Sequence, residues 1–223
     1  MKNNSIRKLT VMAMICAMGF IAMFVFRFNV GFLTFDFKDA IMSVASLIFG
    51  PLAGVICSVL VALLEFITIG DTGVYGLIMD ILSSASFLLI CGIVYKYKHT
   101  FSGAIIAAVC SVIGMTAVMC VANIFITPYY MHVKSSDVVA MIPTLLFPFN
   151  LCKGIMNAAV MLLIYKPLSI VLRKAKLLVS TEAKESKLNK KTVILAICSV
   201  LVLVATALFI VFKLNGQFTL FDI

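Results

Sequence analysis

Three polar side chains stand at helical spacing inside an apolar stretch of the chain. Asn150, Lys153 and Asn157 lie within residues 138–165, a run long enough to cross a bilayer. Separations of three and four residues place all three on one face of a helix. A lysine ammonium within a membrane span costs about 3 kcal/mol on insertion scales, so it usually faces a protein interior and a polar partner. The pattern therefore predicts that something polar is bound or paired at this face.

The composition places these residues in an all-α integral membrane protein. Of the 223 residues, 63% are hydrophobic and 12% are charged, and the mean hydropathy is +1.18. Soluble chains are about a quarter charged, and the apolar runs here lack the alternation of barrel strands. The net charge of +9 comes from basic residues at the ends of apolar runs, a distribution that indicates membrane topology and argues against nucleic-acid binding.

The uncharged residues 40–64 form either one long span or two short helices that meet at Gly50 and Pro51. Cytoplasmic loops of membrane proteins are enriched in Lys and Arg, so the charge distribution decides between these alternatives. A single span would put the basic residues 173–191 outside, whereas the split puts 13 Lys and Arg residues inside, with Lys153 in the membrane. The four that then fall outside are Arg27, Lys38, Lys134 and Lys213. We therefore predict two short helices joined by a cytoplasmic turn, and a cytoplasmic N-terminus.

This topology divides the chain into three parts. Residues 1–174 are predicted to form a six-helix substrate-binding domain, residues 175–191 a basic cytoplasmic linker, and residues 192–223 one additional transmembrane helix with a short tail. Residues 27–39 form an aromatic loop, either at the level of the lipid headgroups or as a lid over a pocket. Residues 65–73 are predicted to be an outer loop. The remaining spans are expected at residues 9–26, 74–94, 100–128, 138–165 and 192–212.

The strongly polar residues of three different spans fall at a similar depth. With a rise of about 1.5 Å per residue, Asp80, Asn123 and Asn150 each lie roughly 8–15 Å below the outer end of their helix, with Lys153 one turn deeper. This predicts a polar layer in the outer half of the bundle, beneath the aromatic loop. The alternative is a structural ion pair between Lys153 and Asp80, which would itself be compatible with a binding site. Asn157 lies a further turn inward and is expected to pack between helices.

The sequence offers no catalytic apparatus. It contains no phosphate-binding GxxxxGK[ST] loop, no HExxH and no GxSxG motif, so neither ATP hydrolysis nor a familiar hydrolase is expected. The seven cysteines lie within apolar runs, without metal-ligand spacing, and are predicted to be packing residues. A channel would need polar rings through both leaflets, and here the inner half is apolar. The chain is therefore expected to be neither an enzyme nor a metalloprotein, but a binding protein energised from elsewhere.

Two stretches resemble a known family. Residues 32–39, FLTFDFKD, followed by residues 48–54, IFGPLAG, are similar to the first loop and second hairpin of the substrate-binding S components of energy-coupling factor (ECF) vitamin transporters. The step NLCKG at residues 150–154 resembles the riboflavin-specific members. The resemblance covers roughly residues 7–174 and implies a six-helix bundle that binds its vitamin on the outer side.

The resemblance also implies sites and partners. Asn123, Asn150 and Lys153 would hydrogen-bond riboflavin, the transported ligand, while Leu33 and Thr34 close over it. Asp80 stands where the riboflavin members are expected to carry an amide. Ala13 and Ala17 give the first helix the small-xxx-small spacing that permits close helix contact.

That spacing is compatible with internal packing or a partner, and the resemblance favours docking to a transmembrane coupling subunit that works with two cytoplasmic ATPases. The implied function is ATP-driven import across the bacterial cell membrane, in which the subunit captures its substrate outside and reorients to release it inside. The alternatives are another vitamin or precursor, or an assembly subunit without a ligand.

Overall fold

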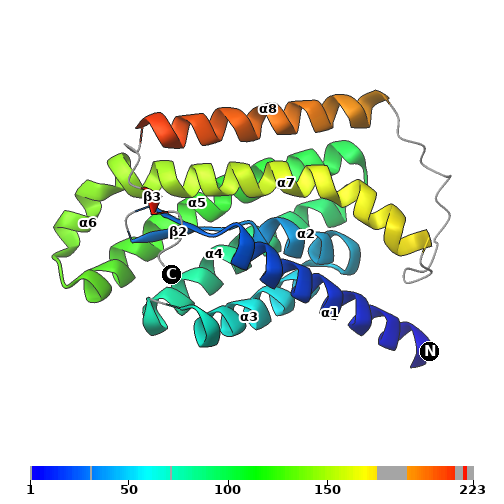
Figure 1. Cartoon of the computed structure of the whole chain (residues 1–223), viewed down its shortest axis with the longest axis horizontal. Helices are drawn as coiled ribbons and strands as arrows, with labels where there is room; N and C mark the ends of the chain where they lie inside the picture. Colours follow the sequence, from blue (N-terminus) through cyan, green and yellow to red (C-terminus); the bar gives the residue numbers. More distant parts are fainter. Residues whose placement is uncertain (1, 31, 71, 175–189, 214–217, 220–223) are drawn as a thin grey trace.

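The computed structural model is a bundle of helices with a small sheet at one end (Figure 1). It describes residues 2–30, 32–70, 72–174, 190–213 and 218–219; the predicted linker at residues 175–189 lies outside them. The helices are α1 (Lys2–Val25), α2 (Lys38–Phe49), α3 (Pro51–Thr68), α4 (Gly73–Tyr97), α5 (Phe101–Met131), α6 (Ser135–Met141), the π-helical turn η1 (Ile142–Leu146), α7 (Phe147–Lys174) and α8 (Lys190–Lys213). The strands are β1 (Phe28–Val30), β2 (Leu33–Phe35) and β3 (Phe218–Thr219).

The predicted split of residues 40–64 is confirmed, because α2 ends at Phe49 and α3 begins at Pro51. Gly50 lies between them with a φ of 98°, a conformation that residues with a side chain rarely adopt. Pro51 opens α3 at a position where its missing N–H costs nothing. Gly54 of α3 and Gly92 of α4 allow close packing around this turn: an added Cβ would meet Ser46 at 2.7 Å from Gly54 and the Pro51 Cα at 2.6 Å from Gly92.

Five helical segments of the described residues are long and apolar enough to cross a membrane: Ser5–Val25, Pro51–Thr68, Gly73–Tyr97, Ser102–Met131 and Ser135–Leu168. α2 has 12 residues and spans only about 18 Å, less than the roughly 30 Å of a bilayer core. The N-terminal turn of α2 therefore lies inside the bundle, and this placement positions the site described below.

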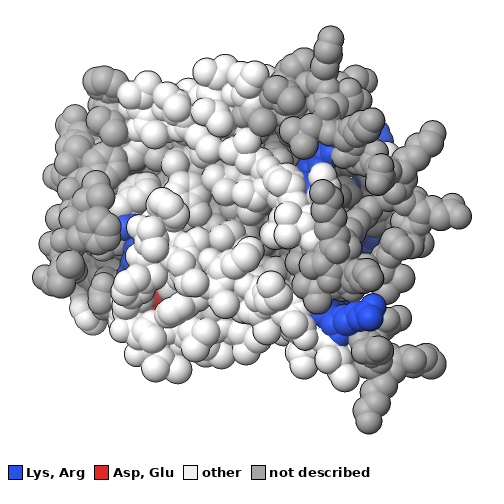
Figure 2. Space-filling model, turned by 45° about the vertical axis from the view of Figure 1, so that its right-hand side comes forward, with Lys and Arg blue, Asp and Glu red and all other residues white. Residues whose placement is uncertain are grey.

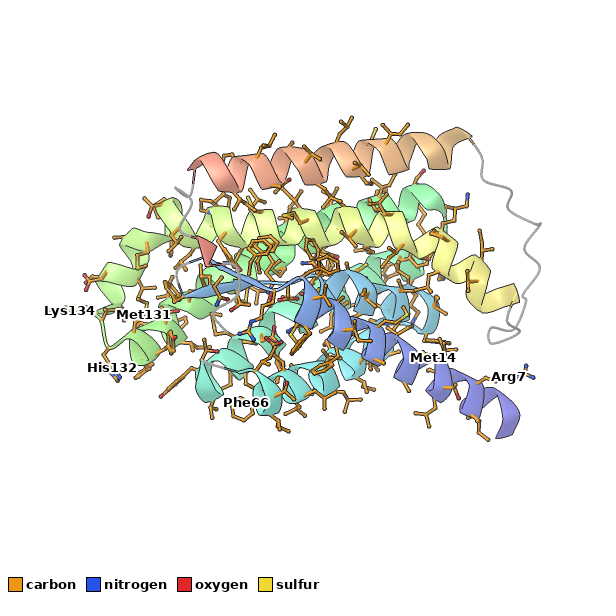
Figure 3. The ribbon with its side chains drawn as sticks, viewed as in Figure 1. Arg7, Met14, Phe66, Met131, His132 and Lys134 are labelled. Carbon is orange, nitrogen blue, oxygen red and sulfur yellow. The ribbon has the colours of Figure 1, made fainter. Side chains whose placement is uncertain are left out.

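The distribution of charge on the surface agrees with a bundle of membrane-spanning helices. In Figure 2 the middle of the visible face is uncharged, and the Lys and Arg atoms lie toward its edges. Figure 3 shows Arg7 at one end of the bundle and His132 and Lys134 at the opposite end. The N-terminal end of α1 and the turn between α2 and α3 lie at the same end, and the β1–β2 hairpin lies toward the other (Figure 1).

The aromatic loop contains two strands that the sequence did not predict. β1 and β2 pair antiparallel, with Phe28 opposite Phe35 and Val30 opposite Leu33. The rings of Phe28 and Phe35 stack with centroids 4.7 Å apart, and Phe35 meets Phe149 of α7 edge-on at 5.6 Å. Aromatic packing therefore holds the hairpin, which we call the lid, against the bundle.

The last helix, α8, packs along α7 (Figure 1), and its crossing of the membrane stays a prediction. Its side chains are described for Ile197–Ile210, an apolar stretch shorter than a complete span. Ile210 is buried, whereas Leu208 and Phe209 beside it are about half exposed. α8 thus presents one face to the bundle.

Candidate ligand-binding site

A cavity of about 930 Å³, counting its open mouth, lies beneath the lid. Its walls come from the lid and from α3, α4, α5 and α7, so elements distant in sequence share one chamber. The apolar part of the wall is formed by Phe32, Leu33, Ala62, Phe66, Leu77, Met79, Met119, Ile126 and Phe149, with Tyr75 and Tyr130.

All six residues that the sequence singled out for ligand contact line this one cavity. They are Leu33, Thr34, Asp80, Asn123, Asn150 and Lys153. Four separate elements contribute them: β2, α4, α5 and α7. The polar residues that the helix rise placed at a similar depth thus line the same cavity.

Lys153 forms its ion pair with the end of the lid. Its side chain is 8% exposed, and Nζ lies 2.8 Å from Asp36 Oδ2 and donates to the Thr34 carbonyl at 3.3 Å. The alternative of a Lys153–Asp80 pair is therefore wrong. Sequence reasoning missed Asp36, which it left in the loop, because nothing local marks a carboxylate 117 positions away as the partner.

Asp36 joins the lid to both α2 and α7. Its Oδ1 accepts from the Lys38 backbone N–H at 3.1 Å, while Oδ2 is held by Lys153. Burial raises the pKa of the Asp36 carboxyl, but the charges of Lys153 and Lys38 outweigh burial and bring that pKa down to about 2. The group is therefore an anion at neutral pH, which keeps the pair with Lys153 charged.

Asn157, one helical turn beyond Lys153 in α7, bonds to the segment that joins the lid to α2. Its Nδ2 donates to the Asp36 carbonyl at 2.9 Å, and its Oδ1 accepts from the Ala40 N–H at 2.9 Å. The residue is 1% exposed and does not line the cavity. The structure thus gives Asn157 the packing role expected of it.

A second ionic group lies behind the cavity wall. The Lys38 ammonium is bonded to Glu65 of α3 and, at 2.5 Å, to Asp80 of α4. The Lys38 side chain is fully buried, whereas Glu65 and Asp80 are 14% and 17% exposed and line the cavity. Asp39 is also buried, and its carboxylate has no hydrogen-bond partner among the described residues.

Two sequence-based placements are corrected here. Lys38 was expected outside the membrane in a loop, but it lies inside the bundle because α2 is short. Glu65 was expected in an outer loop, but it belongs to α3, which continues to Thr68. A signal that could have pointed to both residues is the charge on either side of the uncharged run 40–64, with Lys38 and Asp39 before it and Glu65 after it.

The two asparagines are anchored to their own helices. Asn123 Nδ2 donates to the Met119 carbonyl at 2.7 Å, and Asn150 Nδ2 donates to the Leu146 carbonyl at 2.8 Å. The Thr127 hydroxyl donates to Asn123 Oδ1 at 2.7 Å. Since a side-chain amide has two N–H donors, each asparagine can keep this bond and still donate into the cavity.

Comparison with known proteins identifies the family. Residues 7–165 match the family described as the substrate-specific component of ECF transporters. The chain belongs to this family. A solved S component of a bacterial ECF transporter superposes with a TM-score of 0.64 at 30% identity, covering 76% of this chain and 99% of that one.

Among curated relatives of this S component, the riboflavin transporter RibU of Staphylococcus aureus (strain TCH60) is 31% identical over 179 residues, which is 75% of this chain and 93% of RibU. The riboflavin transporter FmnP of Bacillus subtilis (strain 168) is 28% identical over 172 residues, which is 72% of this chain and 90% of FmnP. These relatives are transport proteins and not enzymes, and this S component is likewise a multi-pass membrane protein that binds a substrate.

The first helix of this S component leaves one face uncovered. Ala13 and Ala17 are exposed, as are Met14 (Figure 3) and Ile21, at 45% and 60%. The opposite face, with Ile15, is buried against the bundle. Ala13 and Ala17 therefore face away from the protein interior, so they do not serve packing within the described bundle.

Proposed function

We propose that this S component binds riboflavin in the cavity beneath the lid, on the outer side of the membrane, as the substrate-binding subunit of an ATP-driven importer. The observation that carries the proposal is the convergence of Asn123, Asn150 and Lys153 on one largely aromatic and aliphatic chamber. The riboflavin transporters RibU and FmnP among its relatives support the choice of ligand.

Riboflavin has the chemistry that such a chamber would recognise. Its flat three-ring system has apolar faces and one polar edge of carbonyl and N–H groups, and its ribityl chain carries hydroxyls. The rings would pack against Phe66, Tyr75 and Phe149. The amides of Asn123 and Asn150 and the Lys153 ammonium would meet the polar edge and the ribityl chain.

Two further contacts complete this proposed arrangement. Leu33 and Thr34 of β2 would close over the ligand from the lid, since both line the cavity from that side. The Asp80 carboxylate would accept from a ligand hydroxyl or N–H, because an ionised carboxylate is an acceptor only. Its pairing with Lys38 leaves lone pairs for such a contact.

Riboflavin binding is tested directly by the emission of the ligand, because the chain contains no Trp. We expect the purified S component to quench riboflavin fluorescence with a Kd between about 1 nM and 1 µM. A thermal-shift panel of vitamins would show stabilisation by riboflavin through mass action. Stabilisation by a different vitamin would replace riboflavin with that ligand, and no response to any would favour an assembly subunit.

The exposed face of α1 is the proposed docking surface for the transmembrane coupling subunit, which would link this chain to two cytoplasmic ATPases. In that assembly the N-terminus is cytoplasmic, in keeping with the predicted excess of inside Lys and Arg. ATP hydrolysis by the partners would drive reorientation of the S component and release of substrate inside. Residues 1–174 would form the binding domain, followed by the linker and the additional helix.

The docking surface can be tested apart from the ligand site. Substituting Ala13→Leu together with Ala17→Leu should abolish co-purification with the coupling subunit, because close helix approach depends on small residues. Riboflavin binding by the isolated variant should stay within about twofold of the wild type. The matched control is Met14→Leu, which keeps the size of a neighbouring exposed side chain. Intact co-purification of the double variant would exclude this face.

A further inference from the structure

The lid carries a third strand that comes from the end of the chain. β3 pairs antiparallel with β1, with Asn29 opposite Thr219 and Val30 opposite Phe218. The strand order β2-β1-β3 makes β1 the central strand of the sheet. The lid is therefore not an isolated hairpin, which would be marginally stable in water, but part of a three-stranded sheet.

The helix before β3 packs against the same lid. Ile210 of α8 is 2% exposed and belongs to one buried cluster with Phe35 of the lid and Phe149 of α7, with Leu203 packed beside them. Phe149 also lines the cavity, and so does Leu33, which packs against the same cluster. Two turns of α8, from Leu203 to Ile210, thus share one apolar cluster with both the lid and the cavity wall.

These contacts come from a part of the chain beyond the family match, which ends at residue 165. The solved S component is covered over 99% of its length by only 76% of this chain. α8 and β3 are therefore added to a component whose binding domain has its counterpart elsewhere. Figure 1 places α8 on the far side of the bundle from α1, so the addition leaves the face of Ala13 and Ala17 open.

We propose that α8 and β3 form a strap that holds the lid down over the cavity and slows the release of bound ligand. The strap acts at two points, through the buried cluster that Ile210 shares with Phe35 and Phe149 and through the β3–β1 pairing. Opening the lid requires both to separate. The identity of the ligand rests on the function proposed above, whereas the strap itself rests only on these contacts.

The proposal predicts the dissociation rate of riboflavin in two variants. Ile210→Ala removes the packing contact. Phe218→Pro together with Thr219→Pro removes backbone N–H donors, and because successive N–H groups point to opposite sides of a strand, the pair includes whichever one faces β1. We expect each variant to release riboflavin about tenfold faster in a dilution experiment that follows recovery of flavin emission. The matched control, Leu208→Ala on the exposed side of α8, should stay within about twofold.

Hydrogen exchange of the lid provides a readout that needs no ligand. Backbone amides of residues 28–35 should exchange faster in both variants than in the wild type, while those of α4 should not change. Unchanged dissociation and unchanged lid exchange in both variants would overturn the strap. Failure of the wild type to bind riboflavin would instead refute the proposed ligand, and the exchange experiment would still decide on the strap.

Discussion

Replacing Lys153 with methionine should weaken riboflavin binding by at least about 100-fold, because two interactions are lost together. The ammonium is the cationic donor that lines the cavity from α7, and a hydrogen bond to a charged group contributes about 1.5–3 kcal/mol. The change also leaves the Asp36 carboxylate buried without its partner at the end of the lid. Loss of one member of a buried pair costs about 3–5 kcal/mol.

A double variant separates these two effects. Lys153→Met combined with Asp36→Asn removes the uncompensated charge and should recover most of the thermal stability, yet it should still bind riboflavin poorly. Recovery of affinity in the double variant would show that Lys153 acts only by holding the lid. Lys134→Met is the matched control, since Lys134 is an exposed lysine away from the cavity (Figure 3). Wild-type affinity in Lys153→Met would contradict a role in binding. The affinities are measured by fluorescence titration.

The depth of the polar layer followed from the sequence because its causes are local. Helical spacing fixes which residues share a face, and the cost of a charge in a membrane marks Lys153 as exceptional. Charge counting then fixed the split at Gly50, which set the direction of every later helix. Those steps placed Asp80 and Asn123 at a depth similar to that of Lys153, and all three residues line the same cavity.

The ionic partners could not be found in the same way. The pairing of Lys153 with Asp36 joins residues 117 positions apart, and it depends on how far α2 penetrates the bundle. α2 begins two residues before the uncharged run and has only 12 residues, so its first turn carries Lys38 into the interior. Lys38 was counted among the outer charges because it was expected in a loop. It lies instead in the buried first turn of α2.

The sheet was missed because its strands are only two or three residues long. A period of two cannot be recognised over so few positions, and the third strand comes from residues 218–219. The sequence predicted the last helix but not its place on α7 beside the lid. Long-range placement of this kind depends on side-chain packing, here of the cluster that contains Ile210 and Phe35, and not on the composition of either segment.

Replacing Lys38 with methionine should have the largest effect on stability. Its fully buried ammonium compensates Glu65 and Asp80 at once, and without it two carboxylates face each other beneath the lid. Loss of a buried partner costs about 3–5 kcal/mol, which for a domain of this size lowers the midpoint of unfolding by roughly 6–20 °C. Thermal unfolding in detergent measures the change, and a midpoint within 2 °C or so of the wild type would contradict a compensating role.

Neutralising the carboxylates tests whether charge compensation is the cause. The triple variant Lys38→Met, Glu65→Gln, Asp80→Asn retains the size of both cavity side chains and removes the repulsion, so it should regain most of the lost stability. A triple variant as unstable as Lys38→Met would assign the loss to packing instead. Riboflavin affinity then separates structure from recognition: a stable triple variant that binds weakly places a carboxylate in contact with the ligand, whereas full affinity makes the group a scaffold for the lid. Because Asp80 lines the cavity and Lys38 does not, we expect the former.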